Sequence, residues 1–184
     1  MNNDWKDFKI PSILYYDRDG TFCGAGDPAQ WDDVEFPPVL CRHIHRWKLK
    51  LAKGELPAAA KKYMTAELPE DKSIVDLFAD FICYLFDSTV AHIKEAEPTG
   101  VVLWRNFGPT IEIVLTHPNG WEGHQQELMR KAVVQAAIFD EEDARNRVSF
   151  VTEGEASFNY CVTNTKSGES LEMSAIWQIN GDRF

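Results

Sequence analysis

The stretch from residue 111 to residue 137 constrains the fold most, because a buried-strand pattern there passes through a proline turn into a helix. Residues 111–116 form a near-continuous apolar run with β-branched side chains, which is typical of a strand covered on both faces. Pro118 interrupts this run, and apolar residues then recur at helical spacing over residues 121–137. The segment predicts a strand, a turn and a helix in direct succession.

A second unit of the same kind follows. Residues 148–151 form a short apolar strand pattern that runs into an acidic turn, and we expect a helix from about Glu155. A β-α-β-α order favours neighbouring parallel strands joined by a right-handed crossover. The sequence therefore predicts an α/β fold in which helices flank a mixed sheet.

Two further elements precede these units. Residues 11–26 predict a β-hairpin with its turn at Asp19–Gly20. Ser73 is positioned to cap a long helix that ends before Pro98, and Asp76 favours the positive end of its dipole. The broad apolar stripe of this helix must pack against something large. Residues 27–71 have a poorer pattern, with a short helix expected near residues 58–62.

Composition narrows the class of partners. The 184 residues are 44% apolar and carry a net charge of −10, which repels nucleic-acid phosphates and anionic membrane surfaces. The first residues are polar, and no apolar run approaches the roughly 20 residues that span a bilayer. We therefore expect a soluble cytoplasmic protein with no nucleic-acid or membrane partner. The four scattered cysteines are expected to be buried small side chains.

Residues 11–20 look like a P-S-V-V-x-F-x-x-D-G hairpin, and residues 24–29 look like a G-x-x-A segment behind it. Residues 115–118 look like a strand end T-V-P, and residues 152–156 look like a turn N-E-P-T-A. Between about Pro11 and Cys161, the order of these motifs resembles the nucleotide-binding domain of the 70-kDa heat-shock protein family, particularly its divergent fungal members. The resemblance implies a partial actin-like ATPase fold (ribonuclease H-like), with ATP and Mg²⁺ as cofactors.

The resemblance assigns roles to three residues. Lys48 matches the lysine that positions the attacking water and stabilises charge during ATP hydrolysis, with Lys50 as a substitute. Glu153 matches the glutamate that reaches magnesium through water. Pro118 matches a proline that switches between nucleotide-dependent conformations. Each residue also has a structural interpretation. Lys48 could lie on a solvated basic helix face, Glu153 could be an exposed glutamate near a helix N-terminus, and Pro118 could simply form a rigid turn.

The sequence also departs from the family pattern. In the family, the switching proline works with a partner arginine, and Gln126 stands at the position of that arginine. Gly154 stands where the family has proline. Neither the D-x-G-T-T loop before Pro11 nor the D-x-G-G-G-T loop after Cys161 is found. We therefore expect one incomplete domain over residues 1–184, truncated and with weak or no ATPase activity. Its parts are a hairpin and irregular lobe (11–72), a helix-strand core (73–164) and a divergent tail (165–184).

Other interpretations stay open. A non-catalytic interaction module that docks on a full-length relative or chaperone would use apolar surface that an incomplete fold leaves uncovered. A degenerate product without function is not separated from it by sequence. Cys41, His43 and His45 alternate as zinc ligands do on one strand face, but a fourth ligand has no source, so we assign no metal site. His117 and His124, with Glu122, resemble an acid/base cluster without a nucleophile.

Overall fold

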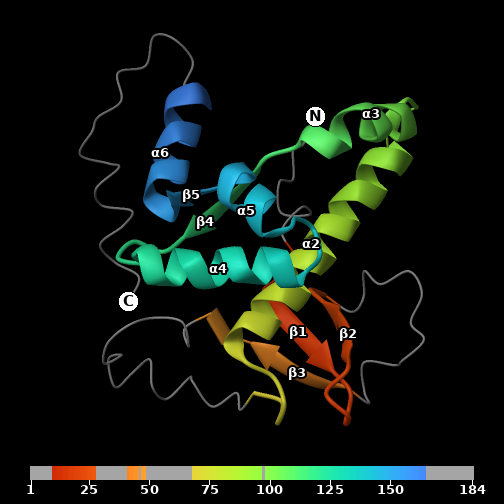
Figure 1. Cartoon of the computed structure of the whole chain (residues 1–184), viewed down its shortest axis with the longest axis vertical. Helices are drawn as coiled ribbons and strands as arrows, with labels where there is room; N and C mark the ends of the chain where they lie inside the picture. The colour runs from red at the N-terminus through yellow and green to blue at the C-terminus, as the bar shows by residue number, and fades with distance from the viewer. Residues whose placement is uncertain (1–9, 28–40, 46, 49–67, 97, 165–184) are drawn as a thin grey trace.

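Residues 10–27, 41–45, 47–48, 68–96 and 98–164 are described by the structure, which is a computed structural model. They form a three-stranded antiparallel sheet, a two-stranded parallel sheet and five α-helices (Figure 1). The predicted mixed α/β class is therefore confirmed. The two groups of strands do not join into one mixed sheet within the described residues, so that part of the prediction is wrong.

The predicted hairpin is present. Strand β1 (Ile13–Tyr16) pairs antiparallel with β2 (Phe22–Ala25), and Leu14 lies opposite Ala25. The Asp17 carboxylate closes the turn, because it accepts the backbone N–H groups of residues 19 and 21 at 2.9 and 2.8 Å. Gly20 takes φ +79° there, a left-handed conformation that glycine adopts without strain.

The third strand of this sheet comes from a segment whose sequence pattern is weak. Strand β3 (Arg42–His45) pairs antiparallel with the other edge of β1, in the order β2-β1-β3. Ile44 is its only buried residue, and it lies opposite Leu14. A strand with one inward apolar side chain carries little periodic signal, which explains why the sequence does not reveal it.

The long helix begins and ends where the sequence predicts. Helix α2 spans Ile74–Ala96, just before Pro98. Ser73 N–H donates to Asp76 Oδ2 at 2.6 Å, and Asp76 N–H donates to Ser73 Oγ at 3.3 Å. This reciprocal pair satisfies backbone donors that a helix N-terminus otherwise leaves without partners.

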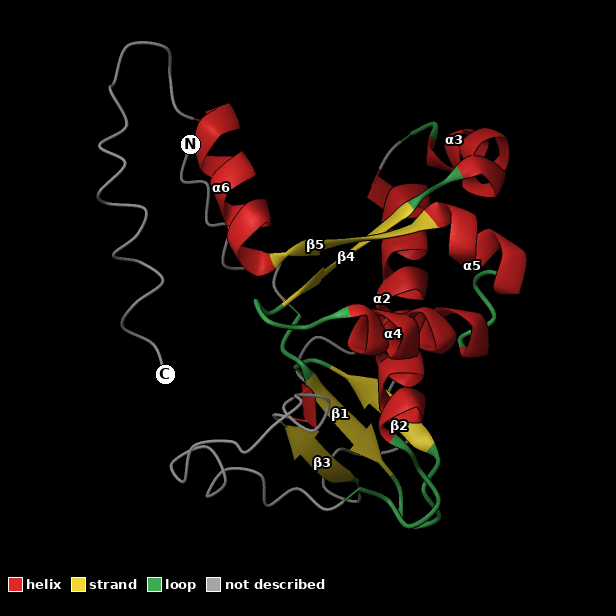
Figure 2. Cartoon of the chain, turned by 60° about the vertical axis from the view of Figure 1, so that its left-hand side comes forward, coloured by secondary structure: helices red, strands yellow, loops and turns green. Residues whose placement is uncertain are grey.

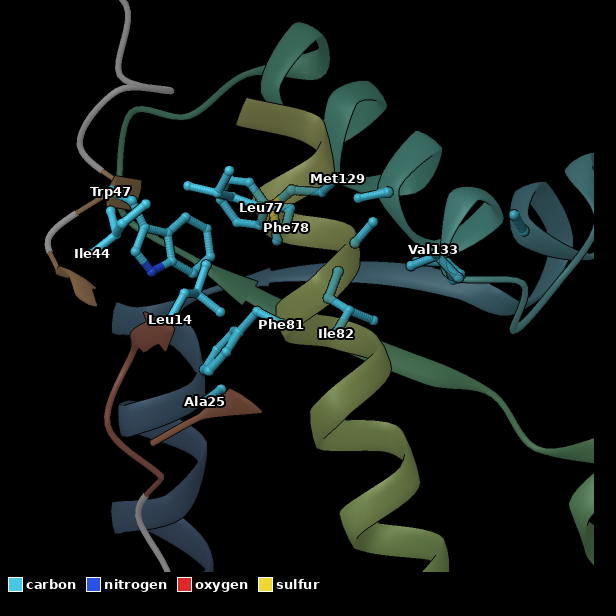
Figure 3. Packing of buried hydrophobic residues seen from close by; sticks show 14 of the residues in the cluster. Leu14, Ala25, Ile44, Trp47, Leu77, Phe78, Phe81, Ile82, Met129 and Val133 are labelled. Carbon is cyan, nitrogen blue, oxygen red and sulfur yellow. The ribbon is translucent and has the colours of Figure 1, made fainter. Parts of the chain in front are cut away.

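The core lies where α2 crosses the antiparallel sheet (Figure 3). Trp47 is 0% exposed, and its ring centroid lies 4.6 Å from that of Phe78 and 5.5 Å from that of Phe81. Its indole N–H donates to the Ser12 carbonyl at 3.0 Å, so the polar atom is satisfied inside the core. The other fully buried apolar side chains are Leu14, Ala25, Ile44, Leu77, Ala132, Val133 and Ala144.

The parallel pair confirms the predicted βαβ order. Strand β4 (Ile113–His117) pairs with β5 (Val148–Thr152) in a register that runs from Ile113↔Val148 to His117↔Thr152. Helix α4 (Gly123–Gln135) makes the crossover together with α5 (Glu141–Arg147), a short helix that the sequence analysis misses. Figure 2 shows α4 lying across α2 and the two strands above it.

Two expectations need correction, and one helix was not expected. Strand β4 is not covered on both faces, because Val114 is 59% exposed on the outward side. Helix α6 (Glu153–Asn164) begins two residues earlier than expected. Helix α3 (Gly100–Phe107), followed by the 3₁₀ turn η5 (Gly108–Thr110), was not predicted.

Some expectations fall outside the described residues: the short helix near 58–62, Lys50 and the tail 165–184. Among the helices that the structure describes, none combines the length and apolar character needed to cross a membrane.

Candidate functional site

The candidate site lies at the carboxyl ends of β4 and β5. Both strands run in the same direction, so the turn after His117 and the turn after Thr152 meet at one edge (Figure 2). Helices α4 and α6 start from these turns. In open α/β sheets, ligands bind at the edge formed by the carboxyl ends of parallel strands.

His117 fixes the turn that contains Pro118. Its side chain is 3% exposed and stacks on Trp121 with an interplanar angle of 5°. Nε2 lies 3.1 Å from Gln126 Nε2, and Nδ1 lies 2.9 Å from the Pro118 carbonyl oxygen. An amide nitrogen only donates, so we assign the tautomer in which Nε2 accepts from Gln126 and Nδ1–H donates to Pro118.

The same turn lies against the start of α6. A Cβ placed on Gly154 would be 3.4 Å from both terminal atoms of the Asn119 side chain, an ordinary van der Waals distance. Gly120 takes φ +83° and bends the chain toward α4. The sequence therefore brings Pro118, which the resemblance makes a switch, next to the β5–α6 junction.

Helix α6 has its own cap. Glu155 Oε2 accepts from the Thr152 backbone N–H at 2.9 Å and from its hydroxyl at 2.8 Å, while Glu155 N–H donates to Thr152 Oγ at 3.1 Å. These hydrogen bonds, first that of the backbone and then that of the hydroxyl, lower the pKa of Glu155. Glu155 therefore serves the cap, and the neighbouring Glu153 is an exposed acidic residue in the first turn of the same helix.

Lys48 approaches this edge from the antiparallel sheet. It follows Trp47 just after β3, and its Nζ lies 5.3 Å from the Phe81 ring centroid and 5.8 Å from that of Trp47. The residue as a whole is exposed, yet its ammonium sits over these two rings. Burial of the ammonium lowers the pKa of Lys48, and the negative charge of Glu153 opposes this shift.

Two of the three residues that the resemblance singles out are linked only through their charges. The negative charge of Glu153, in the first turn of α6, opposes the lowering of the Lys48 pKa. Pro118 lies at the same edge, beside Asn119 and Gly154. The sequence analysis did not assign a role to Asn119 or Thr152, and only the strand register reveals that they share this edge.

The residues of the two other constellations differ in their contacts and in their burial. Cys41 Sγ lies 3.0 Å from Cys23 Sγ, while His43 and His45 stack on one another with centroids 6.0 Å apart. His117 is buried, whereas His124 and Glu122 are exposed. In the part of the chain that the structure describes, no group of three or more His, Cys, Asp or Glu side chains is arranged to hold a metal ion.

Comparisons with known proteins add no relative. No protein-family model matches the sequence, and neither the curated proteins nor the solved structures contain a match.

Proposed function

We propose that this chain is part of a nucleotide-binding domain of the 70-kDa heat-shock protein type, whose intact relatives bind Mg-ATP and couple its hydrolysis to conformational change. The carboxyl edge of β4 and β5 holds Mg-ATP weakly in this chain, with Lys48 and Glu153 facing the phosphates. The observation that carries the proposal is the shared edge: the parallel register brings the turns after β4 and β5 together there, and the negative charge of Glu153 acts on the Lys48 ammonium.

The chemistry of the pair suits phosphoryl transfer. A lysine ammonium partly removed from water stabilises negative charge on a phosphate more strongly than an exposed one. A carboxylate at a strand-to-helix turn suits Mg²⁺, which keeps several waters and takes few protein ligands. Lys48 also stacks over Phe81, which limits the positions its ammonium can take.

ATP hydrolysis by the chain itself is expected to be weak or absent. The printed sequence contains neither a D-x-G-T-T loop nor a D-x-G-G-G-T loop. Phosphoryl transfer depends mainly on positioning and electrostatic stabilisation of the phosphates. A site without these loops lacks most of the groups that would provide them. Binding, rather than turnover, is therefore the property to measure.

A thermal melt with and without Mg-ATP tests the proposal. A ligand at ten times its Kd stabilises by about 1.4 kcal/mol, which raises the Tm of a chain of this size by about 3 to 6 °C. We expect Lys48→Ala and Glu153→Gln to reduce this shift. Lys131→Ala and Glu95→Gln, which change exposed residues away from the edge, serve as matched controls and should keep it. No Tm shift of the unmodified chain at 10 mM Mg-ATP (about ten times a millimolar Kd) contradicts the proposal.

A second candidate function is a non-catalytic interaction module. An apolar groove of about 380 Å³ runs along β4, lined by α2 and by Trp104 of α3. Beside it, α3 exposes a group of apolar side chains: Val101, Val102, Leu103 and Phe107. Grooves of this kind take an apolar segment of a partner, which here would be a full-length relative or another chaperone. A monomeric chain that binds no apolar dye would count against this candidate.

A further inference from the structure

We infer that Cys23 and Cys41 form a peroxide-oxidised disulfide site in the antiparallel sheet. Their Sγ atoms are 3.0 Å apart, although the residues come from β2 and from the position just before β3. Sulfur atoms this close need to move by only about 1 Å to reach the 2.05 Å of a disulfide bond. The inference does not depend on the proposed nucleotide site.

The sheet explains why the two thiols meet. Strand β1 lies between β2 and β3. In the register of both pairings, the two cysteines lie near the same residue of β1, Tyr16. Tyr16 pairs with Phe22 on one side and with Arg42 on the other, so Cys23 and Cys41 are each one residue from a Tyr16 partner. The Sγ–Sγ distance of 3.0 Å shows that the two side chains approach each other near this position.

Cys41 is the thiol that opens into a cavity, although it is only 9% exposed and Cys23 is half-buried. It lines a cavity of about 730 Å³ that also contacts Asp17, Arg42 and Lys72. Cys23 is not among the residues that line this cavity. Burial, and then its contact with Cys41, raises the pKa of Cys23 to about 12, so Cys23 stays protonated and less reactive at neutral pH.

The oxidant class that fits is a small neutral hydroperoxide. The residues that line the cavity carry more carboxylates than cations, which disfavours an anionic oxidant such as glutathione disulfide. Hydrogen peroxide is uncharged and small enough to enter.

The reaction proceeds in two balanced steps. The deprotonated Cys41 sulfur attacks one oxygen of hydrogen peroxide; the O–O bond breaks, Cys41 becomes a sulfenic acid, and the second oxygen leaves as water after taking a proton. The Cys23 sulfur then attacks the Cys41 sulfur; the S–O bond breaks, and the hydroxyl leaves with the Cys23 proton as a second water. Two thiols and one peroxide give one disulfide and two waters.

The bridge would tie together the two strands that flank β1. Since β3 leads directly to Trp47 and Lys48, the disulfide would fix the strand that carries the lysine of the candidate site. Reduction of the disulfide would release strand β3 again. The disulfide would therefore form when peroxide is present and be lost when the chain is reduced.

The test uses the full reduced chain, hydrogen peroxide as the probe, and peptide mapping by mass spectrometry after alkylation. We expect a Cys23–Cys41 bridged peptide to form at least about tenfold faster than any oxidation of Cys83, whose thiol also lies next to a carboxylate. Cys83→Ser is the matched control and should leave the bridge unchanged.

Variants separate the two roles. With Cys23→Ser, Cys41 has no partner thiol, so a sulfenic acid should accumulate there and be trapped by dimedone; with Cys41→Ser, Cys23 should stay reduced. A thermal melt checks that each variant folds, and Cys23→Ala replaces Cys23→Ser if the latter does not. Oxidation of Cys83 before the pair, or no bridge in the folded unmodified chain, would overturn the inference.

Discussion

The region around Trp47 and the region around β4 differ in how completely their apolar surface is covered. The fully buried side chains Leu14, Ile44, Trp47 and Leu77 join the antiparallel sheet to α2. In contrast, every exposed large hydrophobic side chain of the described residues lies between positions 101 and 162: Val101, Val102, Leu103, Phe107, Val114, Phe158, Tyr160 and Val162. The first region is a closed core, and the second presents apolar surface for a further contact.

The closed region is therefore expected to determine stability, and the open region is expected to be available for binding. A closed core around Trp47 contributes most of the folding free energy, because burial of apolar area is the dominant favourable term. The open side around β4 contributes less to folding and leaves room for binding. Lys48 follows Trp47 of the closed region, and Glu153 begins α6, whose side chains Phe158, Tyr160 and Val162 are exposed.

The largest expected effect comes from breaking the closed region. Trp47→Ala removes a ring that packs on Phe78 and Phe81 and leaves a cavity, so we expect a loss of about 3 to 5 kcal/mol in the free energy of unfolding. Urea denaturation followed by circular dichroism measures it. Val101→Ala, on the exposed face of α3, should change stability by less than about 0.5 kcal/mol. Equal losses in both variants would remove the distinction between the regions.

A smaller effect is expected where the two regions meet. His117→Phe keeps the ring that stacks on Trp121 but removes the contacts with Gln126 and Pro118, so we expect a loss of about 1 to 3 kcal/mol. The free energy of unfolding in urea measures this, with His124→Phe, an exposed position, as the control. A loss no larger than that of the control would mean that the His117 bonds do not stabilise the Pro118 turn.

The cap of α2 predicts a pH effect. Partial burial raises the pKa of Asp76, but hydrogen bonds from Ser73 and Gln135 and the charge of Lys72 outweigh it and lower the pKa overall. A lowered folded-state pKa stabilises the fold above the ordinary value of 3.8, and this contribution is lost as pH falls below that value. The unmodified chain should therefore lose more stability between neutral and acid pH than Asp76→Asn. Melts at a series of pH values compare them, and parallel curves would contradict the cap's electrostatic role.

The smallest effect on stability is expected on the open side. Val114→Thr and Phe107→Ser should change the free energy of unfolding by less than about 0.5 kcal/mol, because both side chains are more than half exposed. They should, however, reduce the fluorescence of an apolar dye bound to the groove along β4. Unchanged dye binding would show that the groove does not attract apolar ligands.

The sequence reveals elements whose signals are local. The cap at Ser73, the turn at Gly20 and the apolar runs of β4 and β5 each lie within a few residues, and the structure contains all of them. Strand β3 carries no periodic signal, because it has a single inward side chain. Helix α3 is only 8 residues long, so its periodic signal is short. Short helix α5 has a local start signal in the sequence, because Asp140 caps it and three acidic residues stand in its first turn.

The candidate site depends on information that is not local. Lys48 follows β3 and Glu153 begins α6, and no spacing in the sequence encodes that the charge of one acts on the other. The turn residues Asn119 and Gly154 meet because β4 and β5 are parallel and in register to their last pair. Sequence motifs proposed the residues, and tertiary packing decides which of them share an edge.

The most direct test of the central claim is a map of amide chemical shifts in the chain as Mg-ATP is added. The account predicts that shifts concentrate at the carboxyl edge of β4 and β5, at residues such as Asn119, Gly120, Thr152 and Gly154, and that Lys48→Ala weakens them. Shifts confined to α3 and the groove along β4, or no shifts at all, would contradict a nucleotide site at this edge.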